Sequence, residues 1–260
     1  MNDSLILYHE QDHIAWVTLN HPKSYNALSA AMIDALQARI DQLNDHSDIA
    51  VLIIQGAGKG FCAGHDLKEL ADIEHITDRR ALFEKCSNLM LAIQALPMPV
   101  IAGVHGVASA AGCQLVASCD LAFAANDARF GTPGVNIGLF CSTPMVALGR
   151  AIGRKHAMKM LLEGELINAA DAVSYGLINE AVAPDQLEHK LRESAMKIVS
   201  KSRATIKIGK QSFYRQLDMD VALAYDYCSE IMALNLGAPD AKAGIDAFLT
   251  KTAPKWSHKS

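Results

Sequence analysis

Short apolar segments alternate with helical segments along the first two thirds of the chain, and this alternation restricts the fold more than any other feature. A strand, a helix and a second strand in that order imply right-handed crossovers and a layered parallel α/β architecture. The near-continuous apolar run at residues 49–55 is typical of a strand buried on both faces. Strands are predicted for residues 13–19, 49–55, 100–105 and 120–124, and helices for residues 29–44, 79–96 and a segment that contains 114–118.

From about residue 149 the pattern becomes almost entirely helical. Helices are predicted for residues 155–163, 168–175, 186–200, 205–216 and 221–236, with a single strand at 177–182. The chain is therefore predicted to comprise an α/β core over residues 1–165 and a helical C-terminal region over residues 166–260. No low-complexity linker separates them. The glycine-rich loop at residues 56–64 lacks the spacing of a dinucleotide-binding fingerprint.

Composition excludes several classes of function. The 260 residues are half apolar, and the net charge of −4 favours neither nucleic acid nor an anionic membrane as a partner. The six cysteines form no Cys-x-x-Cys pair and the histidines form no His-Glu-x-x-His motif, so no metal site is predicted. No apolar stretch is long enough to span a bilayer. Residues 1–8 resemble neither a signal nor a transit peptide, so a cytoplasmic protein is predicted.

Two turns could present backbone N–H groups to a ligand. In residues 61–70, a glycine precedes His65, and a helix is predicted to start near Asp66. In residues 106–114, a run of small side chains leads directly into a helix. Two such turns facing each other could stabilise an oxygen that gains negative charge. Taken alone, the first turn is better explained as a tight strand-to-helix connection and the second as close helix packing through small side chains.

Together these segments carry the motifs of a known family. They read Asn-x-Pro-x-x-x-Asn-Ala-Leu at 20–28, Phe-Cys-Ala-Gly-x-Asp-Leu at 61–67 and Ala-Ala-Gly-Cys-x-Leu-x-x-x-Cys-Asp at 110–120. The chain thus resembles the enoyl-CoA hydratase/isomerase (crotonase) superfamily from about Trp16 to Trp256. The resemblance implies a spiral of ββα turns with a helical C-terminal trimerisation region. It also implies an acyl-CoA thioester as ligand, no separate cofactor, and a homotrimer or a dimer of trimers.

The resemblance assigns roles to individual positions. The oxyanion-hole amides fall on His65 and on Ala111, where the family has glycine; this departure is mild because only the N–H is used. The remaining substrate-binding positions are the adenine-side carbonyls of Ala27, Ala63 and His65, the loop residues Asp66, Leu67 and Lys68, the phosphate contacts Lys23 and Lys68, the water-binding amide of Ser142, and Phe248, which in the family reaches a neighbouring subunit's CoA.

The two catalytic glutamates of the family map to Gln114 and Gly134. An amide has no pKa suited to proton transfer, and glycine has no side chain. General acid–base catalysis is worth about 100- to 10,000-fold per group. Longer matches over residues 65–70, 132–144 and 254–258 resemble one subgroup of the superfamily, which implies that the missing glutamates are a subgroup feature. The nearby candidates Cys113, Cys141, Ser142, His105 and His65 are not predicted to act as acid or base, and Asp120 is predicted to make a turn or capping bond.

Two functions of different classes remain open. The first is an enzyme of acyl-CoA metabolism that stabilises a thioester enolate. It is nominally a hydratase, but hydration is expected to be weak or absent. Decarboxylation or thioester hydrolysis would depend less on a pair of carboxylates. The second is a non-catalytic acyl-CoA binder or a partner subunit. Gln114 and Gly134 favour the second, and the retained oxyanion turns favour the first. An RNA-binding role gains no support from the acidic net charge.

Overall fold

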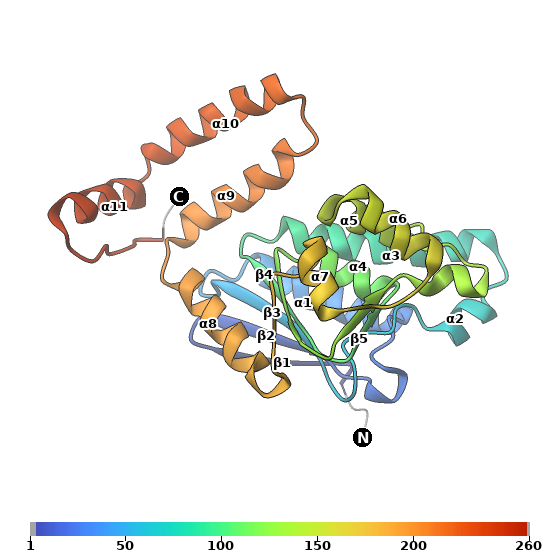
Figure 1. Ribbon diagram of the computed structural model, residues 1–260. Coiled ribbons are helices and arrows are strands. Elements are labelled where there is room, and N and C mark those ends of the chain that lie inside the picture. Colours follow the sequence, from blue (N-terminus) through green and yellow to red (C-terminus); the bar gives the residue numbers. More distant parts are fainter. Residues whose placement is uncertain (1–3, 259–260) are drawn as a thin grey trace.

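The computed structural model describes residues 4–258, so the outermost residues of the two predicted regions lie outside the description. Its main sheet has six strands in the order β1-β2-β3-β4-β6-β9 (Figure 1). β1 is antiparallel to β2, and every other neighbouring pair is parallel, which confirms the predicted α/β class. The strands are β1 (Ile6–Gln11), β2 (Ile14–Leu19), β3 (Val51–Gly56), β4 (Val100–Val104), β6 (Leu121–Ala125) and β9 (Glu180–Val182).

Helices cover both faces of this sheet. On one face, α1 (Ala30–Asn44), α3 (Ile76–Ala95) and α4 (Ala111–Ser118) share a core with Leu52 and Ile54 of β3. On the other, α8 (Leu187–Val199) packs against Val51 and Ile53 of the same strand. β3 is buried on both sides, and this explains its continuous apolar sequence.

A second, three-stranded sheet lies beside the first. It consists of β5 (Val107–Ser109), parallel to β7 (Arg129–Gly131), and β8 (Ile167–Asn168), antiparallel to β7. Sequence reasoning expected only a turn before α4, and the structure places the short strand β5 there. The remaining short elements are η1 (Pro22–Ser24), α2 (Leu67–Asp72), η2 (Pro133–Ile137), α5 (Pro144–Ala151), α6 (Arg154–Glu163), α7 (Ala169–Tyr175) and η3 (Pro184–Gln186).

The last three helices extend away from both sheets (Figure 1). They are α9 (Arg203–Gln216), α10 (Val221–Leu236) and α11 (Pro239–Thr250). β8, β9 and α8 of the predicted C-terminal region pack with the sheets, and the division at residue 165 stays a prediction. Within residues 4–258, none of the helices combines the length and apolar character needed to cross a membrane.

A buried lysine attaches α9 to the core. The Lys210 ammonium lies 2.7 Å from the Asp120 carboxylate and donates to the carbonyls of Ile93 and Met98 at 3.1 and 3.0 Å. Asp120 also accepts the Val100 N–H at 2.6 Å. This bond links the starts of the neighbouring strands β4 and β6, so it is not the turn or capping bond that was predicted for Asp120. A buried charge needs this degree of compensation, because transfer from water is costly.

A buried carboxylate holds the end of the chain. Asp240 is 1% exposed and accepts hydrogen bonds from the Ser202 hydroxyl and from the backbone N–H groups of Ser257 and His258. Burial raises the pKa of Asp240, but these hydrogen bonds outweigh it and leave the pKa at about 2. The C-terminal tail is thereby fastened to the start of α9.

Candidate active site

A buried asparagine shapes the loop that follows β3. The Asn26 side chain is fully buried, and its amide nitrogen lies 2.9, 2.9 and 3.1 Å from the carbonyls of Ala57, Gly60 and Phe61. Its carbonyl oxygen accepts the His21 N–H at 2.9 Å. One side chain thus replaces the regular backbone pairing that the loop lacks. Sequence reasoning used Asn26 only as part of a motif and missed this role.

The end of this loop crosses the start of α4 at backbone contact. Cys62 pairs with Ala108 in an isolated parallel bridge. The Cys62 N–H donates to the Val107 carbonyl at 3.0 Å, and the Ser109 N–H donates to the Cys62 carbonyl at 2.9 Å. A Cβ added at Gly112 would lie 2.2 Å from the Cys62 carbonyl oxygen. No other residue fits there without moving α4 away from the loop.

Two backbone N–H groups lie unpaired at this crossing. Within residues 4–258, no acceptor bonds to the N–H of His65, or to that of Ala111, the first residue of α4. The two segments are close, since a Cβ on Gly64 would lie 3.2 Å from the Ala111 nitrogen. The predicted pair of turns is therefore brought together.

The residue before Ala111 has a strained backbone. Ala110 adopts φ 48° and ψ −114°, a region that favours glycine, while its N–H donates to the Gly131 carbonyl at 2.9 Å. Such outliers cost about 1–3 kcal/mol and gather at functional sites. The sequence signal was an alanine in a run of small residues, which does not reveal the dihedral angles.

The unpaired amides border a cavity of about 390 Å³. Its apolar wall includes Leu70, Phe83, Leu139 and Phe140. Six of the predicted site residues line it: Ala63, His65, Leu67, Ala111, Gly134 and Ser142. A largely apolar cavity with a few convergent polar groups is typical of a small-molecule site.

The two positions predicted to correspond to the family glutamates differ in their surroundings. Gln114 is 4% exposed, and its side-chain oxygen is buried with no hydrogen-bond partner among the described residues. Gly134 lines the cavity, but a Cβ there would lie 2.1 Å from the Leu139 carbonyl oxygen and 2.9 Å from the Cys141 sulfur. The chain itself therefore occupies the space of a side chain at position 134.

The titratable groups of the cavity are uncharged near neutral pH. Burial lowers the pKa of His65, against the raising effects of the Leu28 carbonyl and Glu69. Burial raises the pKa of the Cys141 thiol, partly opposed by a hydrogen bond from the Gly134 backbone. Cys113 on α4 does not line the cavity, and burial raises its pKa to about 12. None of these three side chains carries a charge at pH 7.

The residues predicted to bind CoA are only partly brought together by the chain. Leu28 N–H donates to Gly64 at 2.7 Å and Ala63 N–H donates to Tyr25 at 2.9 Å, so Ala27 and Ala63 lie on adjoining segments. Asp66 caps α2 by accepting the Lys68 N–H at 2.9 Å. Lys23 and Lys68 are exposed.

Two predicted contacts are not formed within the chain. The Ser142 N–H donates to the Phe140 carbonyl at 2.7 Å, so a reacting water would have to compete for it. Phe248 is 83% exposed on α11, which lies at the opposite end of the molecule from α2 (Figure 1). Its predicted role concerns a neighbouring subunit.

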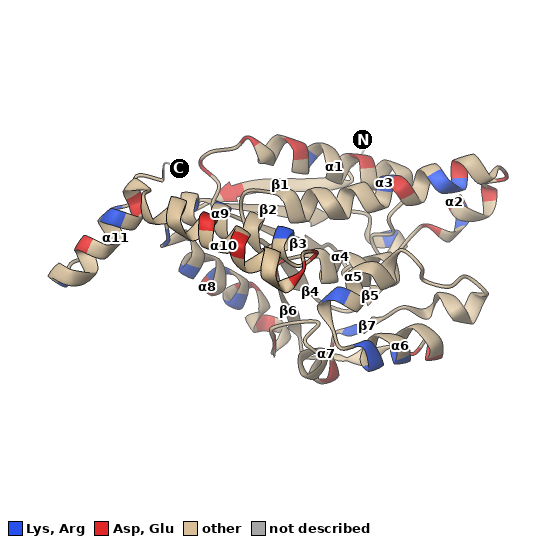
Figure 2. Cartoon of the chain, turned by 90° about the horizontal axis from the view of Figure 1, so that it is seen from above, with Lys and Arg blue, Asp and Glu red and all other residues tan. Residues whose placement is uncertain are grey.

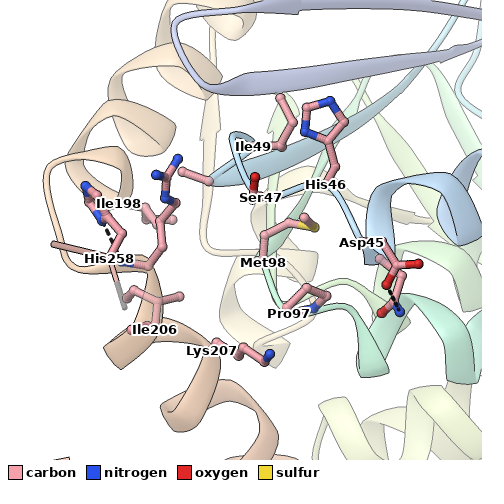
Figure 3. Close-up of a pocket in the computed structure, with 14 residues that line it drawn as sticks. Asp45, His46, Ser47, Ile49, Pro97, Met98, Ile198, Ile206, Lys207 and His258 are labelled. Carbon is pink, nitrogen blue, oxygen red and sulfur yellow. Dashed lines mark hydrogen bonds between the residues drawn. The ribbon is translucent and has the colours of Figure 1, made fainter. Parts of the chain in front are cut away.

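A second cavity, of about 350 Å³, lies where the α1–β3 loop, the α3–β4 loop and the start of α9 meet (Figure 3). Its wall includes His46, Lys207 and His258, and the His258 ring accepts the Arg203 N–H at 3.3 Å. None of the sequence-predicted site residues lines it.

Known proteins share this fold and these segments. The profile of the enoyl-CoA hydratase/isomerase family matches residues 9–259. Mouse enoyl-CoA hydratase domain-containing protein 3 is 47% identical over 249 residues, which cover 96% of this chain and 83% of the relative. A crystal structure of an enoyl-CoA hydratase from Mycobacterium smegmatis superposes with a TM-score of 0.96 at 47% identity, covering 98% of this chain and 99% of the other.

A crystal structure of human enoyl-CoA hydratase domain-containing protein 3 superposes with a TM-score of 0.94 at 46% identity, covering 97% of this chain and all of the other. The chain belongs to the enoyl-CoA hydratase/isomerase family, and its crotonase-type fold is confirmed. The resemblance to one subgroup is also confirmed, because these two relatives share one name.

The predicted cytoplasmic location is wrong. The domain-containing protein 3 relatives from mouse, rat and human, at 46–47% identity, are mitochondrial by name. The prediction rested on composition and on the character of residues 1–8, and neither property determines the compartment in which a folded domain works.

Replacing Gly134 by alanine should destabilise the protein, because the added methyl meets the Leu139 carbonyl at 2.1 Å. Overpacking of this kind costs about 1–3 kcal/mol of unfolding free energy. Gly149→Ala is the matched control, since a Cβ at Gly149 in α5 meets nothing within 4 Å. Urea unfolding of both variants measures the difference in unfolding free energy. Equal free energies would show that the Leu139 segment moves at no cost to make room for the methyl group.

Replacing Ala110 by glycine should raise the free energy of unfolding by about 1 kcal/mol, because relief of backbone strain exceeds the added entropy of the unfolded chain. Lys251→Gly, at a cap with φ 55° and ψ 40°, is the comparison substitution in the ordinary left-handed region and should have a smaller effect. Urea unfolding again provides the measurement. A less stable Ala110→Gly protein would mean that the methyl contributes more than the strain costs.

Proposed function

We propose that this protein binds an acyl-CoA thioester and stabilises its enolate through the backbone N–H groups of His65 and Ala111. The observation that carries the proposal is the pair of unpaired amides beside an apolar cavity of about 390 Å³. Preorganised donors stabilise an oxygen most strongly where charge develops and water is excluded. Membership of the enoyl-CoA hydratase/isomerase family supports the choice of ligand.

The CoA part would lie along the loop that contains Ala63 and Asp66. The carbonyls of Ala27, Ala63 and His65 are the proposed acceptors for the adenine amino group, with Leu67 completing the surface. The exposed ammonium groups of Lys23 and Lys68 are the proposed phosphate contacts, as flexible point charges. No separate cofactor is proposed.

Hydration is expected to be weak or absent. Gln114 cannot act as a general acid or base at neutral pH, and position 134 has no side chain and no free space for one. Decarboxylation, which forms the enolate as carbon dioxide leaves, depends less on a pair of carboxylates and fits the cavity better. The same holds for thioester hydrolysis, in which the two amides would stabilise a tetrahedral oxyanion. A non-catalytic acyl-CoA binder is the second candidate, and the Gly134–Leu139 contact favours it, because it removes the position of one catalytic group.

A homotrimer, or a dimer of trimers, is the proposed assembly. α10 has no buried residue, and among its 16 residues only Asp226 and Glu230 are charged (Figure 2). Its exposed apolar side chains include Tyr225 and Met232, at 73% and 76%. Apolar surface of this extent marks an interaction site. Light scattering should give three or six times the 28.0 kDa chain mass, whereas a monomer would contradict the proposal.

The deciding experiment combines binding and turnover in one sample. Butyryl-CoA should bind at least about tenfold more tightly than free CoA by titration calorimetry, because its acyl group enters the apolar cavity. Hydration of crotonyl-CoA, followed as loss of the conjugated thioester absorbance at high protein concentration, should be slow. Losing two acid–base groups predicts a rate about 10,000-fold or more below that of a hydratase with both glutamates.

The possible outcomes separate the two candidates. Rapid hydration would show that another residue supplies the proton chemistry of the missing pair. Equal affinities for butyryl-CoA and CoA would remove the acyl site itself. Tight binding without turnover of any acyl-CoA would favour the non-catalytic binder.

A further inference from the structure

One cavity side chain can still accept a proton near neutral pH. No Asp, Glu, Lys or Arg is among the described residues that line the cavity. Burial raises the pKa of Cys141, so its thiol keeps its proton. The hydroxyls and amides of the wall do not titrate in this range. His65 is the remaining group, although its sequence context alone did not distinguish it from a packing residue.

The contacts of His65 define the tautomer of its ring. Nδ1 lies 3.2 Å from the Leu28 carbonyl oxygen, and a carbonyl can only accept, so Nδ1 carries the hydrogen. Nε2 therefore holds the lone pair of the neutral ring. Phe83 of α3 packs edge-on against the imidazole at 5.4 Å between ring centroids. The ring is held from two sides by residues of other elements.

The lone pair of Nε2 accepts no hydrogen bond from the described residues. Nε2 is buried and has no hydrogen-bond partner among the described residues. An unpaired buried acceptor costs about 1–3 kcal/mol, so it is retained only where something compensates. A hydrogen supplied by a bound ligand would compensate here, since His65 lines the ligand cavity.

Burial keeps the His65 ring neutral against the charge of a nearby carboxylate. Burial lowers its pKa below the usual 6.5, and the Leu28 carbonyl and the Glu69 carboxylate oppose this. Glu69 on α2 is the one titratable group that acts on the ring in the described chain, and it also accepts the Ala30 N–H at 2.9 Å. α3 presents Phe83, and the segment before α1 presents only the Leu28 carbonyl. The ring can therefore accept a proton over the whole neutral range.

In the proposed complex, the α-carbon of the thioester is the ligand carbon that we expect to lie near the His65 ring. In the proposed function, the backbone N–H of His65 binds the thioester oxygen. The α-carbon is two bonds from that oxygen, and the imidazole belongs to the same residue as the N–H. A ligand held by this amide thus brings its α-carbon close to His65, and catalytic contacts often tighten only in the complex.

We propose that His65 is a catalytic residue that takes a proton from the α-carbon of the bound acyl-CoA and returns it. This inference rests on the proposed function. The C–H bond breaks as Nε2 bonds to the proton, and the electron pair forms the enolate double bond with its charge on the thioester oxygen. The imidazolium keeps its Nδ1–H bond to Leu28. Return of the proton, or of a deuteron from solvent, regenerates the thioester without any other reactant.

Exchange of α-hydrogens with solvent tests the step directly. Butyryl-CoA incubated with the protein in D₂O should gain deuterium at the α-carbon, as measured by mass spectrometry. His65→Gln keeps the backbone N–H and should lower the exchange rate about 100- to 10,000-fold. His189→Gln, an exposed histidine on α8, is the matched control and should exchange at the wild-type rate. Butyryl-CoA affinity should change less than about threefold in both variants.

The pH dependence separates proton transfer from a structural role. Because the neutral ring is the base and its pKa lies below 6.5, the wild-type rate should be level above pH 6.5 and fall as the ring protonates at lower pH. Undiminished exchange by His65→Gln, or bound butyryl-CoA that the wild type does not deuterate, would overturn this inference and leave the acyl-CoA site intact. Failure of the wild type to bind butyryl-CoA would overturn both proposals.

Discussion

The backbone contact between the loop after β3 and the start of α4 is the constraint on which the site depends. The Cys62–Ala108 bridge joins two segments that follow different strands of the main sheet, β3 and β4. Gly112 allows α4 to begin directly over the Cys62 carbonyl, where a Cβ would lie at 2.2 Å. This close approach is possible only because no side chain stands between the two backbones at Gly112. It has two consequences, which are two N–H groups without acceptors and a cavity beside them.

The energetic cost of this crossing is offset nearby. Ala110 lies in a backbone region that favours glycine, yet its N–H is bound to Gly131 and its chain continues into the first turn of α4. Asn26 satisfies loop carbonyls that have no strand partner. The buried side-chain atoms that lack a partner among the described residues lie both beside the site, as Nε2 of His65 does, and far from it, as Nε1 of Trp16 does. A ligand in the cavity would complete the hydrogen bonding of His65, which lines it.

Sequence periodicity predicted the elements whose burial is one-sided or complete. α1 and β3 are examples, because the Ser29 cap and the apolar run at 51–54 report local physics. β5 and β7, of three residues each, depend on pairing with distant segments and have no local pattern. The family motifs indicated the two turns whose N–H groups lie unpaired, and they assigned the positions of the family glutamates to Gln114 and Gly134. The motifs could not reveal the Lys210–Asp120 ion pair or the Gly134–Leu139 contact. In each case the sequence around the two residues does not indicate that they lie close together.

The two positions that the resemblance assigns to the family glutamates differ physically. Gln114 lies on the regular helix α4 and has the size of a glutamate, so a carboxylate there requires no backbone change. At Gly134 the Leu139 carbonyl lies 2.1 Å from where a Cβ would be. A glutamate at 134 would first have to displace the segment that forms one wall of the cavity. The backbone around position 134 therefore leaves no room for a carboxylate, and the proposed proton transfer uses another group that lines the cavity.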